Sequence, residues 1–204
     1  MLSILIVANS DDWHRYKELE ECLLNDYHVD YSDKLSSDSS ELSKLEFSYE
    51  IFFYLKPPQS GEISAISRLL KSKIFIFLVQ KNSFSPLQLK NDLLPVADRV
   101  KLKATAMRGK MEYFRGVDEI LALNAYHIEP REICEIVLNG NRDSRAMLGD
   151  IVFRAGKNVI FGVRKDNLVV LSADIFTNEC FKETQNCRFI KNLISEMLTG
   201  VEFY

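Results

Sequence analysis

The chain has 204 residues and carries 26 Lys and Arg against 29 Asp and Glu, so its formal net charge is −3. Hydrophobic residues make up 47% and charged residues 27%, which is the balance of an ordinary globular protein. A chain of this length buries a sizeable core without staples, so composition excludes a disordered chain, a collagen-like chain and a small disulfide scaffold. It predicts one domain over residues 1–204.

The first half of the chain alternates short apolar runs with amphipathic stretches. Strands are predicted at residues 3–8, 28–31, 50–55 and 73–79, and helices at residues 13–24, 39–45 and 61–70. Asp11 or Asp12 is expected to cap the first helix by accepting a backbone N–H. Because strands that are apolar on both faces and separated by helices are typical of βαβ units, we expect a Rossmann-like or flavodoxin-like, mostly parallel sheet.

The second half of the chain changes character. Short strands separated by Gly- or Asn-containing turns are predicted at residues 100–106, 133–138, 150–154, 158–163 and 167–171, and an extended or mixed segment at residues 119–127. A last helix is expected to be capped by Asn186 or Thr184 and to stop at Gly200. The fold class is therefore α/β, with an antiparallel extension in the C-terminal half that returns to the sheet.

Several catalytic devices are missing from the loops that should follow the strands. The first such loop, Asn9 to Asp12, contains no glycine, and no P-loop pattern occurs, which argues against dinucleotide and P-loop sites. The strand that ends at Leu55 runs into Lys56 and Pro57 without a phosphoacceptor Asp. No cysteine or serine lies in a nucleophile-elbow pattern. We expect no catalytic residue and no enzyme activity.

Histidines and cysteines give no sign of a metal or cofactor. His14, His28 and His127 are scattered, without the spacing that holds a tetrahedral metal site. The four cysteines are expected to be buried or idle thiols, and a Cys180–Cys187 bridge is the alternative. No apolar run approaches membrane-spanning length, and the N-terminus lacks a basic signal-peptide region. We therefore expect no membrane-spanning segment, and these absences point to the cytoplasm.

In an open α/β sheet, ligands bind where the strands end at their carboxyl side. The polar residues predicted at this edge are the candidate binding residues Asn9, Asp11, Asp12, Ser172, Asp174 and Asn178. Asp174 also has a simpler interpretation, as the cap of a helix that follows it.

Charge is distributed unevenly along the chain. Residues 1–50 hold 12 acids and 4 bases, whereas the basic stretch, residues 99–115, holds 6 bases and 1 acid. The bases of this stretch form a candidate patch made of Arg99, Lys101, Lys103, Arg108, Lys110 and Arg115. With no recognised nucleic-acid module, we expect the patch to be a solvated face, or to meet an acidic partner or a phosphorylated glycan or lipid, rather than nucleic acid.

Four stretches together resemble a known family. They are the opening run Ile4–Asn9, the segment Leu45–Pro57, the extended stretch Ile120–Gly140, and Asn167–Asn178 with the Asn-capped closing helix. In this order they resemble the first lumenal domain of the forty-eight-kilodalton subunit of eukaryotic oligosaccharyltransferase, and a related domain of an intraflagellar-transport subunit. The resemblance implies a class I amidotransferase-like fold without an active site, protein partners in a complex, and the endoplasmic reticulum.

Two functions follow as hypotheses. The first is a non-catalytic subunit or scaffold domain that supports a multi-protein complex through surface contacts, as the resemblance implies. The second is a domain that binds a nucleotide, sugar or phosphate, or a hydrolase, and that uses the crevice at the strand carboxyl ends.

Overall fold

The computed structural model describes residues 1–199, so the predicted helix stop at Gly200 lies outside the described part. A seven-stranded sheet forms its centre, in the order β2-β1-β3-β4-β11-β10-β7. The strands are β1 (Ser3–Val7), β2 (His28–Ser32), β3 (Ile51–Tyr54), β4 (Ile74–Leu78), β7 (Glu135–Asn139), β10 (Ile160–Lys165) and β11 (Leu168–Leu171).

The sheet is parallel at one side and antiparallel at the other. β2, β1, β3, β4 and β11 pair in parallel, and β10 pairs antiparallel with both β11 and β7. The predicted fold class, a mostly parallel sheet with an antiparallel extension, is confirmed.

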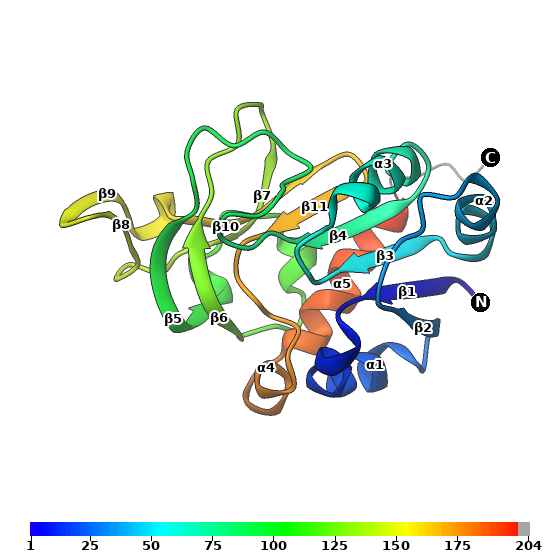
Figure 1. The fold of residues 1–204 in the computed structure, drawn as a ribbon. Coiled ribbons are helices and arrows are strands. Elements are labelled where there is room, and N and C mark those ends of the chain that lie inside the picture. The colour runs from blue at the N-terminus through cyan, green and yellow to red at the C-terminus, as the bar shows by residue number, and fades with distance from the viewer. Residues whose placement is uncertain (200–204) are drawn as a thin grey trace.

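Helices cover both faces of the sheet (Figure 1). On one face lie α1 (Lys17–Leu23), α4 (Asn178–Glu183) and α5 (Asn186–Thr199), and on the other lie α2 (Ser39–Ser48) and α3 (Ser60–Leu69). Neighbouring residues of a strand point to opposite faces, so Ile51 and Phe53 enter one buried cluster and Phe52 and Tyr54 the other. This explains why the central strands are apolar throughout.

Aromatic pairs fix the register between β3 and β4. Phe52 lies opposite Phe75, and Tyr54 lies opposite Phe77. The rings stack with centroids 4.9 Å and 5.1 Å apart, respectively. A slip of one residue would separate both pairs and would move each side chain to the wrong face.

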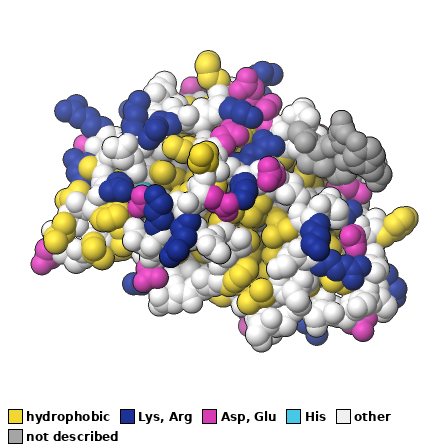
Figure 2. Space-filling model, turned by 90° about the horizontal axis from the view of Figure 1, so that it is seen from above, with side chains coloured by type: hydrophobic (Ala, Val, Ile, Leu, Met, Phe, Trp, Pro, Cys, Tyr) yellow, Lys and Arg dark blue, Asp and Glu magenta, His cyan; other side chains and the backbone are white. Residues whose placement is uncertain are grey.

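Two antiparallel pairs stand beside the central sheet. β5 (Leu94–Lys103) pairs with β6 (Glu119–His127), and β8 (Arg145–Leu148) pairs with β9 (Ile151–Ala155). The hairpin β8–β9 projects from the molecule (Figure 1), and hydrophobic side chains gather at the same end of the surface in Figure 2. These exposed side chains include Leu148, Ile151 and Val152.

The first predicted helix, residues 13–24, differs from the structure. A short 3-10 helix at Ser10–Tyr16 precedes α1, and the Trp13 indole N–H donates to the Ala8 carbonyl at 2.9 Å, which holds that first turn against the end of β1. Neither Asp11 nor Asp12 caps it, because the N-cap residue is Asn9 and makes no side-chain cap hydrogen bond. The predicted cap is therefore wrong.

Other elements were missed or placed short. β5 begins six residues before the predicted start at residue 100, and β8 and α4 were not predicted. α4 has only six residues, too few for a helical period to show. A disulfide joins Cys22 of α1 to Cys187 of α5, whereas Cys180 is a buried free thiol, so the Cys180–Cys187 alternative is wrong.

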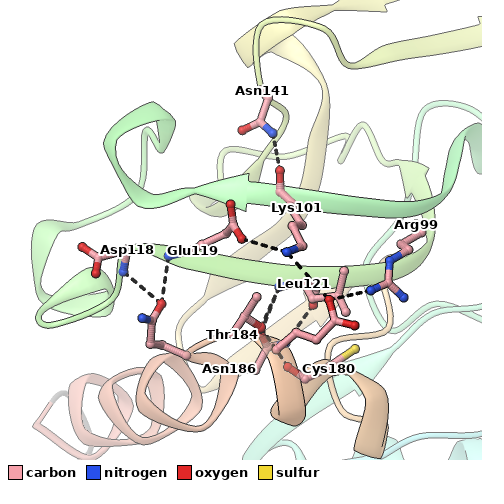
Figure 3. Close-up of polar contacts among 11 residues, drawn as sticks. Arg99, Lys101, Asp118, Glu119, Leu121, Asn141, Cys180, Thr184 and Asn186 are labelled. Atoms are coloured by element: carbon pink, nitrogen blue, oxygen red, sulfur yellow. Dashed lines mark hydrogen bonds and ion pairs between the residues drawn. The ribbon is translucent and has the colours of Figure 1, made fainter.

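The side chain of Asn186 ties α5 to β6 (Figure 3), and it also binds the segment after β11. Its Nδ2 donates to the carbonyls of Leu121 at 2.8 Å and Ile175 at 2.9 Å. Its Oδ1 accepts from the Leu121 N–H at 2.9 Å and from the Thr184 hydroxyl at 2.5 Å. Asn186 is fully buried, so no water replaces these bonds.

No helix within residues 1–199 is both long enough and apolar enough to cross a membrane.

We expect Asn186→Ala to lower the free energy of unfolding by about 2–4 kcal/mol, because it leaves backbone groups of Leu121 and Ile175 buried without partners. Asn25→Ala is the matched control, since Asn25 is exposed, and it should change stability by no more than about 0.5 kcal/mol. Urea denaturation followed by circular dichroism measures both. Equal stability of the two variants would contradict the bracing role of Asn186.

Candidate functional site

A cavity of about 390 Å³ opens at the carboxyl ends of the parallel strands, and we call it the crevice. The chain segments that follow β1, β3, β4 and β11 all contribute to its walls. The site lies here because β1 has β2 on one side and β3 on the other, so the connections on its two sides diverge and leave an opening.

Four of the six predicted binding residues line the crevice, namely Asn9, Asp12, Ser172 and Asp174. Asp11 is exposed and is not part of the wall. Asn178 serves α4 instead, because its Oδ1 accepts from the Glu18 N–H at 3.0 Å and its Nδ2 donates to the His14 carbonyl at 2.9 Å.

Other polar residues of the wall were not predicted. They come from the turn after β1, from the loop after β4 and from β6, and they are Arg15, Tyr16, Gln80, Lys81, Asn124 and Tyr126. The first four follow parallel strands, so their place in the sequence was a usable signal. The position of Asn124 in the crevice wall could not be predicted from the sequence. Asn124 lies within β6 with a positive φ of 46°, which departs from the regular strand conformation.

The acidic and basic groups nearest β1 neutralise each other. Asp12 accepts from the Asn9 amide at 3.1 Å and from the Arg15 guanidinium at 3.3 Å. The hydrogen bond from Asn9, with help from Arg15, lowers the pKa of Asp12 below its usual value. Asp12 is therefore held as a carboxylate whose charge Arg15 balances.

Asp174 is in the opposite electrostatic situation. Only 8% of the residue is exposed, and burial raises the pKa of its carboxyl above the usual 3.8, although the N–H of Phe176 and the charge of Arg15 work against this. The Phe176 N–H donates to Oδ1 at 3.0 Å. The side chain thus forms a local turn before α4, whose own N-cap residue is Thr177.

Backbone bonds fix Asp174 in place from the side of β6. Leu123 and Asp174 exchange backbone hydrogen bonds of 2.8 Å and 2.9 Å, and the Tyr126 N–H donates to the Ser172 carbonyl at 3.0 Å. The Ser172 hydroxyl donates to backbone carbonyls of Tyr126 and Phe161. It therefore braces the wall and is not free for a ligand.

Several polar groups around Asp174 have no side-chain partner among residues 1–199. These are the hydroxyls of Tyr16 and Tyr126 and the side chains of Gln80, Lys81 and Asn124, all of which line the crevice. Burial, together with the nearby Asp174, raises the pKa of Tyr16, which keeps its hydroxyl protonated. The crevice thus combines a protonatable carboxyl with uncommitted hydrogen-bonding groups.

Cys180 lies behind the wall and not in it. The residue is fully buried, and its Sγ lies 3.4 Å from the Thr177 hydroxyl. Burial raises the pKa of the Cys180 thiol to about 12. Because the thiolate is the nucleophilic form, this cysteine is unsuited to attack a substrate in the crevice.

Three of the six bases of the basic stretch, residues 99–115, are paired with acids, and Figure 3 shows pairs of Arg99 and Lys101. Arg99 forms ion pairs with Glu179 and, at 2.7 Å, with Glu183. Lys101 lies 3.4 Å from Glu119, and Lys110 lies 3.5 Å from Glu135. The remaining bases, Lys103, Arg108 and Arg115, have no ion pair among residues 1–199.

Potential metal ligands do not gather within residues 1–199: no three His, Cys, Asp or Glu side chains lie together in a way that would hold an ion.

Comparison with known proteins places the chain beside an archaeal protein. It is 61% identical over 204 residues, which is the full length of both chains, to an "Uncharacterized protein" of Archaeoglobus fulgidus. No family model matches the chain.

Two solved structures from Thermotoga maritima are similar to this chain, and the first shares its fold. One is titled the structure of PurLQS, with a TM-score of 0.51, 14% identity, and coverage of 96% of this chain and 99% of the other. The other is a glutamine amidotransferase, with a TM-score of 0.44, 14% identity, and coverage of 97% and 83%, respectively.

These findings correct the sequence interpretation. The full-length relative is archaeal, so the resemblance to a eukaryotic oligosaccharyltransferase subunit is wrong. The solved structure with a TM-score above 0.5 is PurLQS and not such a subunit, which contradicts the predicted oligosaccharyltransferase-like, non-catalytic scaffold and, with it, the expected absence of enzyme activity. The resemblance misled because its segments are those that build an amidotransferase-like sheet, and that fold is shared by proteins of different function.

The raised pKa of Asp174 predicts a distinct pH dependence of stability. In the unfolded chain this carboxyl ionises near its ordinary pKa of 3.8, but the folded protein keeps the proton to higher pH. Relative to Asp174→Asn, the free energy of unfolding of the wild type should therefore fall as pH rises from about 4. Urea denaturation between pH 4 and pH 8 measures the difference.

Asp11→Asn is the control for this measurement, because it removes an exposed carboxylate beside the crevice. Its stability should follow the wild type across the pH range. Parallel curves for the wild type and Asp174→Asn would contradict the proposed protonation of Asp174.

Proposed function

We propose that this chain, which belongs to the same family as the Archaeoglobus fulgidus protein, binds a small polar molecule in the crevice and hydrolyses it with Asp174 as the proton-transferring group. The observation that supports this most directly is the buried carboxyl of Asp174, which lies in the wall of the cavity and has a raised pKa. Carboxyls whose pKa is raised by burial are frequent at functional sites, where acid–base chemistry requires a shifted pKa.

The shape and chemistry of the walls favour a ligand of the sugar or nucleoside class. Leu55, Leu78 and Val79 offer apolar surface, and Tyr126 adds an aromatic ring. The amides of Asn9, Gln80 and Asn124 stand around this surface and can donate and accept hydrogen bonds. A ring that carries hydroxyl groups has apolar and polar parts to match both.

Asp174 supplies the acid and base for hydrolysis in this proposal. Its carboxyl gives its proton to the oxygen of the leaving group as the scissile bond breaks, and a water molecule forms the new bond to the substrate. The Asp174 carboxylate then takes a proton from that water, which restores the starting state. Arg15, which also pairs with Asp12, favours the Asp174 carboxylate that remains after the proton has left.

Two further expectations complete the proposal. Residues 1–204 act as one domain, and the protein works with a protein partner. The partner is favoured by the exposed side chains of Leu148, Ile151 and Val152 on the β8–β9 hairpin, since projecting apolar groups of this kind mark contact surfaces.

Thermal-shift screening against nucleosides, sugars and their phosphates tests binding. A ligand at 100 times its Kd should stabilise the folded protein by about 2.7 kcal/mol, and Arg15→Gln or Asn124→Ala should reduce the effect. A flat response across the whole library would refute the proposal. The compounds that stabilise the protein in this screen then determine which substrates are used in the turnover assay.

Turnover tests the role of Asp174. Chromogenic esters, glycosides and phosphates, together with L-glutamine, serve as substrates. We expect Asp174→Asn to lower kcat by roughly 100-fold or more, the usual effect of removing an acid–base group, while Asp11→Asn and Cys180→Ser retain wild-type kcat. A loss of turnover in Cys180→Ser with full activity in Asp174→Asn would contradict this assignment.

A further inference from the structure

A second cavity, of about 680 Å³, adjoins the crevice, and we call it the adjoining cavity. The two share Val79 and Gln80, which follow β4 at the middle of the sheet edge. The adjoining cavity is lined by residues of the loop 80–94, by Arg131, and by Leu148 and Phe153 of the β8–β9 hairpin. A ligand longer than one ring can therefore reach from one cavity to the other across Gln80.

Hydrogen-bond donors dominate the polar part of the adjoining cavity. Arg131 and Lys90 line it, and Asp92 is its one lining carboxylate among the described residues. The Arg131 Nε donates to the Leu89 carbonyl at 3.1 Å, and neither terminal guanidinium nitrogen has a partner within residues 1–199. Asn82, with a positive φ of 60°, adds an uncommitted amide to the same rim.

The carboxylate of Glu129, which contacts the cavity residues Lys90 and Asn91, already accepts from several donors. Glu129 lies 3.4 Å from Lys90 Nζ and 3.1 Å from Arg154 Nη2, and it accepts from the Asn91 amide at 3.3 Å. Burial raises the pKa of Glu129, but Arg154 and Lys90 together outweigh it and lower the pKa below its usual value, so Glu129 remains charged. One carboxylate faces two cations, and the region around the rim keeps a surplus of positive charge.

On this basis we propose that the ligand is an organic monophosphate, with its ring in the crevice and its phosphate bound by Arg131 and Lys90 in the adjoining cavity. The proposal rests on the proposed function, whose ligand class it narrows. A phosphate only accepts hydrogen bonds, and the planar fork of Arg131 matches its geometry. Figure 2 shows Lys and Arg side chains between the hydrophobic left end and the middle of the face.

Matched pairs of ligands test the phosphate site. Isothermal titration calorimetry compares adenosine with adenosine monophosphate, and glucose with glucose 6-phosphate, with inorganic phosphate as a separate probe. We expect the phosphorylated member of at least one pair to bind the wild type at least ten-fold more tightly. Arg131→Gln should abolish this preference and leave the affinity for the unphosphorylated member unchanged.

Three further variants sharpen the result. Lys90→Gln should weaken only the phosphorylated ligand, and Asp92→Asn should strengthen it by removing a like charge. Lys71→Gln is the matched control, because Lys71 is exposed and lines neither cavity. Circular dichroism and thermal unfolding confirm that each variant is folded before it is titrated.

The outcomes separate this inference from the proposed function. Equal affinity for both members of every pair, with binding lost in Asp174→Ala, would overturn the phosphate site and leave the crevice intact. The phosphate site would also be overturned if Arg131→Gln lowered the affinity for the phosphorylated and the unphosphorylated ligand by the same factor. If inorganic phosphate binds but none of the adenosine or glucose probes does, the proposal that the crevice holds the ring is contradicted. No binding of any probe would overturn both proposals.

Discussion

The buried amide of Asn186 is the contact on which the geometry of the site depends. It binds both backbone groups of Leu121 in β6 and the carbonyl of Ile175 in the segment after β11. β6 in turn exchanges backbone bonds with Asp174. The position of the Asp174 carboxyl therefore follows from a helix, a strand and a loop that a single side chain holds together, and the Cys22–Cys187 bridge fastens the same helix to α1.

Charge is used differently at the two polar regions of the molecule. Along the basic stretch, Arg99 and Lys101 meet the acids of α4 and β6 at the surface, where ion pairs contribute little to stability. At the crevice, Asp174 is nearly excluded from water, and the cation that acts on it, Arg15, already pairs with Asp12. Burial there outweighs the attraction of Arg15 and raises the pKa of this carboxyl, because a low-dielectric surrounding disfavours the charged form.

The fold by itself does not determine which reaction the protein catalyses. Sheets of this type place their loops at one edge, and different proteins put different residues there. In this chain the edge holds a carboxyl, a guanidinium and amides, while its nearest thiol is buried behind the wall. The strand order of the sheet thus accounts for the location of the crevice, and the side chains of its wall carry the chemistry that we propose.

The local hydrophobic pattern of the sequence predicted the strands, the helices and the mostly parallel sheet. Strands that are apolar on both faces and amphipathic helices can be recognised without knowledge of long-range contacts. It also placed Asn9, Asp12 and Asp174 at one edge, since parallel strands end together. Only the tertiary structure decided that Asn178 supports α4, that Arg99 meets Glu183, and that Cys22 bonds Cys187. These contacts join residues 84 to 165 positions apart, and such pairings depend on how whole elements pack, which no local period records.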